Sequence, residues 1–353
     1  MKNQFTALRL GVLATAAALA LTACGSTGGN GSAGTTAATD QTSPEATATA
    51  SAEESYTIGV SQLVSHPALD AIEEGFEEAF TDAGVDVTFD VKNAQGEVAT
   101  ASSIASSFAG NADIDLVAAI TTPSAQATAS AIRDRPVVFV AVTDPLAAGL
   151  VESLEAPGGN VTGTSDMNPV KEQLQLLKDV DPEVRTVGIV WNSAETNSKV
   201  QVDMAKEVAA ELGLEIKDVS VTNSSEVAQG VQTLSDVDGI YVPIDNAVVS
   251  ALETVVQFGQ DNQIPVVAAN IESVERGALG TYGIDQKAHG RMAGELALRI
   301  LRDDLDPATT PVEFAQEDSL QLVLNPEAAA AFGVEIPQDV LDRADEVIEP
   351  ATR

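Results

Sequence analysis

The residues best suited to chemistry in this sequence are serines, threonines and acids that follow short apolar runs. A catalytic nucleophile needs a base beside it, and the only histidines are His66 and His289. His289 lies inside a predicted helix, whereas His66 precedes a helix that it could cap as readily as it could contact a ligand. The sequence has no Gly-x-Ser-x-Gly elbow, no His-Glu-x-x-His pattern and no pair of cysteines. We therefore expect no enzyme activity, no metal site and no cofactor.

The same side chains suit the binding of a zwitterion, whose carboxylate needs N–H and hydroxyl donors and whose ammonium needs a fixed carboxylate. The donors for the carboxylate would be Thr121 and Thr122, at the start of a predicted helix, and Ser193, Asn197 and Ser198 in a later loop. Asp144 and Asp245 could meet the ammonium, although a single loop aspartate caps a helix as readily as it contacts a ligand. Further polar residues predicted at the same strand ends are Gln62, Thr143 and Asn270.

Alternating strands and helices must position these loops. Predicted strands of a first set cover 57–60, 85–91, 114–120 and 136–142, and those of a second set cover 187–191, 214–221, 239–244 and 264–269. In the second set, the polar loop after the strand 187–191 leads into an amphipathic helix that ends at Gly213. Because the carboxyl ends of parallel strands share one edge of a sheet, each set predicts one polar edge.

We therefore predict an α/β fold with two doubly wound parallel-sheet lobes joined by a multi-stranded hinge. The first lobe comprises residues 56–163 and 281–305, because 280–284 is interpreted as a strand returning to it, and the second comprises 164–280. The segment 306–353 has no lobe assigned. A hinge of several strands favours rigid-body closure of the lobes.

The first residues resemble a bacterial lipoprotein signal. Lys2 and Arg9 precede an apolar run, and small residues then lead to Cys24, the only cysteine. The resemblance implies a signal peptide over 1–23, with cleavage before Cys24 and lipidation of its sulfur. An uncleaved anchor followed by a chance cysteine is the alternative. Residues 24–55, the lipidated cysteine and a Gly-, Ser-, Thr- and Ala-rich stretch, would be a flexible tether, so we expect an extracytoplasmic protein lipid-anchored to the cell membrane.

The charge of the chain argues against nucleic acid as a partner. The formal net charge is −35 at pH 7, which repels phosphate backbones. A DNA-binding regulator is also disfavoured because no N-terminal helix-turn-helix precedes the lobes. Aromatic residues make up only 4% of the chain, which weakly disfavours a sugar as the ligand.

Several short phrases occur together in one order. They are GVSQLVSHPALD (59–70), AITTP (119–123), VTDP (142–145), GNVTG (159–163), NSAETNS (192–198), VPIDN (242–246), RGALGTYG (276–283) and LN (324–325). Through them the region 56–348 resembles the solute-binding lipoproteins of tryptophan/tyrosine-type ABC uptake systems, in the type I periplasmic-binding-protein superfamily.

The resemblance implies a two-lobed protein that closes on a small solute and docks on a membrane permease with a cytoplasmic ATPase. By the superfamily's pattern, Thr121, Thr122 and Thr143 would hold the α-carboxylate of an amino acid, and Asp245 would meet its ammonium. Trp191 stands where a smaller aromatic residue is expected, and it could line the pocket or fill the core.

We therefore expect a monomeric solute-binding lipoprotein of an ABC importer, whose ligand is a small zwitterion such as an amino acid, aromatic ones included. A sensor that presents the bound solute to a membrane receptor is the alternative, because it would use the same residues.

Overall fold

The computed structural model describes residues 55–315 and 319–349. The predicted signal peptide, Cys24 and all of the predicted tether except its last residue lie outside these ranges. No helix within the described ranges is long and apolar enough to cross a membrane.

The first sheet has the strand order β11-β5-β4-β3-β1-β2, and every neighbouring pair is parallel. Its strands are β1 (Ser55–Gln62), β2 (Asp86–Asn93), β3 (Leu116–Ile120), β4 (Val137–Val140), β5 (Val161–Ser165) and β11 (Glu313–Phe314). The order reverses at β1, which lies between β2 and β3. Such a switch point places loops that can bind ligands at the carboxyl ends of the strands.

The second sheet repeats this topology in the order β13-β12-β10-β9-β8-β6-β7. Its strands are β6 (Thr186–Asn192), β7 (Glu215–Val221), β8 (Gly239–Val242), β9 (Val266–Ala268), β10 (Gly280–Gly283), β12 (Gln321–Leu324) and β13 (Glu346–Val347). All pairs are parallel except β10 with β12. The prediction of two doubly wound lobes is therefore confirmed.

Helices cover the sheets because the central strands are buried on both faces. Along β3, Leu116 and Ala118 pack with Phe76, whereas Val117 and Ala119 pack with Phe108 on the opposite face. The helices joined to the first sheet are α1 (Pro67–Asp82), α2 (Val98–Ala109), α3 (Thr122–Ala131) and α10 (Gln286–Arg302). Those of the second are α4 (Val170–Val180), α5 (Thr196–Leu212), α6 (Val227–Val231), α7 (Asn246–Ser250), α8 (Leu252–Asn262), α9 (Ile271–Glu275), α11 (Pro326–Ala331) and α12 (Gln338–Leu341), with 3₁₀ turns at Ser224–Glu226 and Gln232–Leu234.

The chain passes between the two sheets more than once. Residues 166–169 connect β5 to α4, residues 284–285 connect β10 to α10, and the link from β11 to β12 is described only in part. The interpretation of 280–284 as a strand of the first lobe is corrected by the pairing, which places β10 between β9 and β12. The return to the first lobe begins only with α10. The segment 306–353, for which no lobe was predicted, contributes to both lobes, because β11 joins the first sheet and β12 and β13 join the second.

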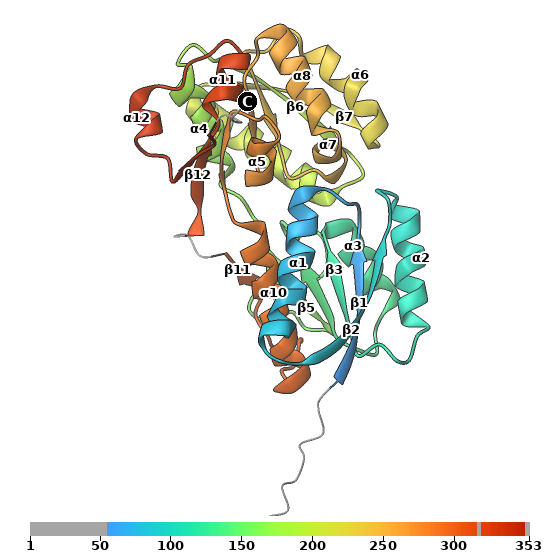
Figure 1. The fold of residues 1–353 in the computed structure, drawn as a ribbon. Helices are drawn as coiled ribbons and strands as arrows, with labels where there is room; N and C mark the ends of the chain where they lie inside the picture. The colour runs from blue at the N-terminus through green and yellow to red at the C-terminus, as the bar shows by residue number, and fades with distance from the viewer. Residues whose placement is uncertain (1–54, 316–318, 350–353) are drawn as a thin grey trace, which may run out of the picture. The chain divides into compact units, whose positions relative to one another are not determined.

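Helix α10 returns to the first lobe through close packing on α1, and Figure 1 shows the two helices side by side. A Cβ on Gly75 would lie 2.0 Å from the carbonyl oxygen of Lys287, and one on Gly290 would lie 2.0 Å from that of Ile72. Glycine at both positions therefore lets the helix backbones touch, which fixes the position of the α10 amino end.

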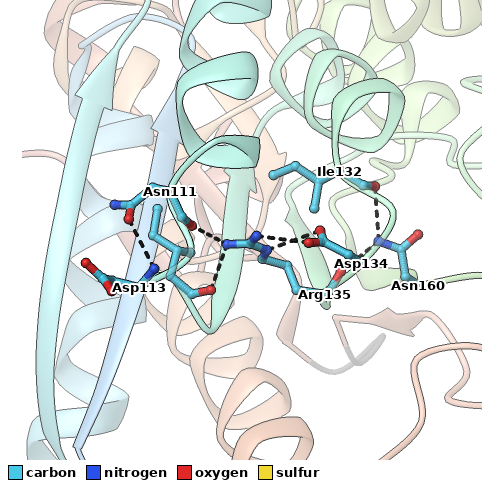
Figure 2. A network of polar contacts seen from close by, with 7 residues as sticks. Asn111, Asp113, Ile132, Asp134, Arg135 and Asn160 are labelled. Atoms are coloured by element: carbon cyan, nitrogen blue, oxygen red, sulfur yellow. Dashed lines mark hydrogen bonds and ion pairs between the residues drawn. The ribbon is translucent and has the colours of Figure 1, made fainter. Parts of the chain in front are cut away.

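The amino ends of the first sheet's central strands are held together by Arg135, as Figure 2 shows. Its guanidinium donates to the carbonyl oxygens of Asn111 and Ile114, at 2.5 and 2.9 Å, and pairs with Asp134 at 3.0 Å. The Asn160 amide donates to the Arg135 carbonyl oxygen at 2.7 Å. These contacts lie at the amino edge of the sheet, so the polar loops at the opposite, carboxyl edge take no part in them.

Candidate functional site

A cavity with about 410 Å³ of empty space, which includes open solvent, lies at the carboxyl edges of both sheets. It is lined by His66, Ala68, Leu69, Ile72, Thr121, Thr122, Ala141, Thr143, Asp166, Asn197, Ile244, Asp245, Asn246, Val249, Asn270 and Gln286. The lining includes three titratable residues, two of them acids, and neither lysine nor arginine occurs in it. Elsewhere too, the described residues contain no cluster of His, Cys, Asp or Glu that could hold a metal ion.

The structure brings together most of the residues that the sequence singled out for binding. Those that line the cavity are Thr121, Thr122, Thr143, Asn197, Asp245 and Asn270. The others, which are Gln62, Asp144, Ser193 and Ser198, do not line it.

Each of these four outlying residues has a local structural contact instead. Gln62 donates to Asp70 at 2.9 Å, and Asp144 accepts from the backbone N–H of Leu146 and of Ala147. The exposed Ser193 donates to the Val221 carbonyl oxygen at 3.3 Å, and Ser198 is fully buried behind Asp245, with which it shares a hydrogen bond.

One wall of the cavity is the amino end of α3. Thr121 directly precedes this helix and has φ 83° and ψ 159°, a region that is nearly restricted to glycine and costs about 1–3 kcal/mol for other residues. The hydroxyls of Thr121 and Thr122 are buried, and neither has a hydrogen-bond partner among the described residues. Free hydroxyls beside unpaired N–H groups at the positive end of a helix form a receptor for an anion.

A second wall is formed by Thr143 and Asp166. The Thr143 hydroxyl donates to Oδ1 of Asp166 at 3.0 Å, so its hydrogen is engaged by a neighbouring acid. Asp166 directly follows β5, where the chain first leaves the first sheet, and it is 3% exposed. Burial raises the pKa of Asp166 to about 6, because no cation lies beside its charge.

A third wall, from the second lobe, contains Asp245 and lies against Glu195. Asp245 accepts hydrogen bonds from the backbone N–H of Val248, which caps α7, and from that of Asn192. Burial and the nearby charge of Glu195 raise the pKa of Asp245. Glu195 is 3% exposed and accepts from three asparagine side chains and from the backbone of α7. The two acids therefore tie the β6–α5 loop to the start of α7.

Three further polar residues face the cavity with unused or partly used groups. His66 caps α1 by accepting from the Leu69 N–H at 3.5 Å, and it also lines the cavity, so both of its expected roles are compatible. Burial, with a contribution from the charge of Arg276, lowers the pKa of His66 to about 4, so the ring is neutral at pH 7. The Asn197 Oδ1 and the Gln286 Oε1 have no hydrogen-bond partner among the described residues.

Trp191 does not line the cavity. Its ring packs on the core of the second lobe, and its Nε1 donates to Asp218 at 2.9 Å. Trp191 is thus partly buried against the core and does not form part of the cavity wall.

Sequence reasoning missed the acid of the first lobe and the apolar part of the lining. Asp166 follows β5 in the same way that Thr143 follows β4, so the rule for strand ends could have found it. Gln286 begins the helix that returns to the first lobe. Leu69, Ile72 and Val249 are helix residues of ordinary core type, and no sequence signal separates a cavity wall from a core position.

The chain is similar to known ligand-binding proteins in both sequence and structure. A family model described as ABC transporter substrate binding protein matches residues 57–348. The tyrosine-binding protein of Clostridioides difficile is 39% identical over 283 residues, which are 79% of this chain and 81% of that protein. The solved ABC domain of Streptococcus pneumoniae in complex with L-Trp is 38% identical with a TM-score of 0.80, and the match covers 84% of this chain and all of that one.

A ligand-free, open structure of a substrate-binding protein with adhesive properties from Clostridium difficile is 41% identical with a TM-score of 0.62, again over 84% of this chain and all of that one. Solute-binding proteins at 15% and 14% identity share the fold alone.

Proposed function

Because the chain belongs to the ABC transporter substrate-binding protein family, which is not a family of enzymes, we propose that it captures an aromatic amino acid and delivers it to a membrane permease. The observation that carries this proposal is the cavity at the carboxyl edges of both sheets, which combines an anion receptor, two buried acids and an apolar wall. The relatives named for tyrosine and crystallised with L-Trp support an aromatic side chain.

The carboxylate of the amino acid would lie at the amino end of α3. The hydroxyls of Thr121 and Thr122 would each donate to it, and the helix dipole would favour its charge. Charge-assisted hydrogen bonds of this kind are the strong ones, because the acceptor is ionised.

The ring of the amino acid would pack on the apolar wall. Leu69 and Ile72 from α1 lie on one side of the cavity lining, and Ile244 and Val249 belong to the second lobe. A ligand that touches both lobes binds only their closed arrangement, so it shifts the equilibrium towards closure by its difference in affinity. At similar identity the chain superposes better on the L-Trp complex than on the open, ligand-free relative, which supports a cavity completed by closure.

The proposal is tested by titration calorimetry with the twenty amino acids, common sugars and nucleosides. We expect L-tryptophan or L-tyrosine to bind with a dissociation constant in the micromolar range or below, roughly −8 kcal/mol or stronger. Binding of a sugar or nucleoside in place of every amino acid would refute the proposal.

Replacing Thr121 with glycine should weaken binding without lowering stability. Glycine adopts the positive φ of 83° without strain, so the free energy of unfolding of the ligand-free protein should rise by up to about 1 kcal/mol or stay level. The lost hydroxyl should weaken amino-acid binding by about 1.5–3 kcal/mol. Denaturant unfolding and calorimetry measure the two changes, and a loss of stability without a loss of affinity would contradict this role.

We also propose that Cys24 carries the lipid anchor, as the sequence motif implies, and that the folded part works outside the cytoplasm beside its permease. The Cys24→Ser variant should then incorporate no labelled palmitate and move from the membrane fraction to the soluble one. Equal labelling of the variant and the wild type would exclude Cys24 as the acylated residue.

A further inference from the structure

We propose that Asp166, at the first crossing between the lobes, binds the ammonium of the amino acid, and that Asp245 instead holds the second lobe's wall in place. This inference rests on the proposed function and deepens it. It differs from the expectation that the superfamily's pattern attaches to Asp245.

The hydrogen bonds of Asp245 are the first reason. One of its carboxylate oxygens accepts from the Val248 N–H at 2.9 Å and the other from the Asn192 N–H, and Ser198 bonds to it as well. Asp245 is also fully buried. A ligand ammonium would have to compete for the Asp245 carboxylate with these two backbone N–H groups, which have no other acceptor among the described residues. Asp245 is therefore a poor acceptor for a ligand.

Asp166 is buried as well, but fewer donors reach its carboxylate. Its only side-chain donor within the described residues is the Thr143 hydroxyl, which bonds to Oδ1 and leaves Oδ2 without one. Both residues line the cavity. The Thr143 hydroxyl thereby orients the acid, while the second oxygen remains for a cation supplied by the ligand.

The spacing along the sheet edge is the second reason. Thr121 follows β3 and Asp166 follows β5, with β4 between these two strands. Two strand spacings separate the backbones by roughly 10 Å. The carboxylate and the ammonium of an α-amino acid lie only a few ångströms apart, so a ligand between these strand ends can reach both side chains through hydrogen bonds.

The charges around Asp166 are the third reason. A buried carboxylate without a cation is unfavourable, and a ligand ammonium would remove that cost. The other titratable groups on the cavity wall are His66, which is neutral at pH 7, and Asp245. No lysine or arginine lines the cavity, so the ammonium of the ligand would be the cation beside this acid.

The test compares the isosteric variants Asp166→Asn and Asp245→Asn with two pairs of ligands, L-tryptophan with indole-3-propionate and L-tyrosine with 3-(4-hydroxyphenyl)propionate. The second member of each pair lacks only the ammonium. Calorimetry should show that D166N binds the preferred amino acid about 100-fold more weakly, while its affinity for the des-amino partner changes less than about threefold. D245N should keep the wild-type preference for the amino acid, and thermal unfolding reports whether each variant is folded.

Equal losses for both members of a pair in D166N would overturn the inference, as would a folded D245N that alone loses the preference. A wild type that binds both members equally would show that no acid recognises the ammonium. Failure of the wild type to bind either pair would instead refute the proposed function, so the two failures are distinguishable.

Discussion

The Glu195→Ala variant is expected to lose about 3–5 kcal/mol of unfolding free energy, a large fraction of the stability of an ordinary domain. Glu195 is 3% exposed and accepts hydrogen bonds from the side chains of Asn192, Asn197 and Asn246 and from the backbone N–H groups of Asn246 and Ala247. Each buried donor left without a partner costs about 1–3 kcal/mol. Denaturant unfolding, followed by circular dichroism, measures the loss.

The matched control is Glu207→Ala, which removes an exposed acid from α5, the helix that Glu195 precedes. This control should stay within about 0.5 kcal/mol of the wild type. An equal, small effect in both variants would mean that Glu195 does not organise the second lobe's wall.

The affinity for the aromatic amino acid is expected to fall about tenfold between pH 7 and pH 5. Burial raises the pKa of Asp166 to about 6 in the ligand-free protein, whereas a bound ammonium would favour the ionised form and lower that pKa. Below pH 6 the ligand must therefore displace a proton, and each pH unit below the pKa weakens binding about tenfold. Calorimetric titrations at pH 5, 6 and 7 measure the slope.

The Asp166→Asn variant supplies the control for this pH dependence. It should bind weakly but with nearly the same affinity at pH 5 and pH 7. His66 contributes little over this range because its pKa is lowered to about 4, and Asp245, whose pKa is also raised, is present in both proteins. An equal fall in both proteins would assign the titration to Asp245 and not to Asp166.

The raised pKa of Asp166 has a further consequence for folding. The folded state holds its proton more tightly than the unfolded chain, whose aspartate has a pKa near 3.8. The stability that this group contributes is therefore present at low pH and is lost as the pH rises from about 4 to 6. Ligand affinity and folding stability thus respond to pH in opposite directions at this one carboxyl.

Much of the fold could be predicted from the sequence because the buried parallel strands are short, continuous apolar runs. β3 and β4 are of this kind, and the polar residues after them mark the edge that carries the cavity. The strand β10 was predicted in the wrong lobe, because the pairing partner of a strand depends on residues that are distant in the sequence. β10 pairs with β12, which lies about forty residues later.

The site could be predicted only as an edge of the sheet. Residue type and position place Thr121 and Asp245 in the loops, but they do not tell whether a side chain faces a ligand or its own helix. Asp144 and Asp245 illustrate this, since both cap local backbone and only Asp245 lines the cavity. Asp166 was not among the predicted binding residues, although it directly follows β5.

A crystal structure of the protein with its amino acid tests the central claim most directly. It should show the ligand in the described cavity, with its carboxylate at the Thr121 and Thr122 hydroxyls and its ring against Leu69 and Ile72. A ligand bound outside this cavity, or one whose carboxylate points away from the amino end of α3, would contradict the account.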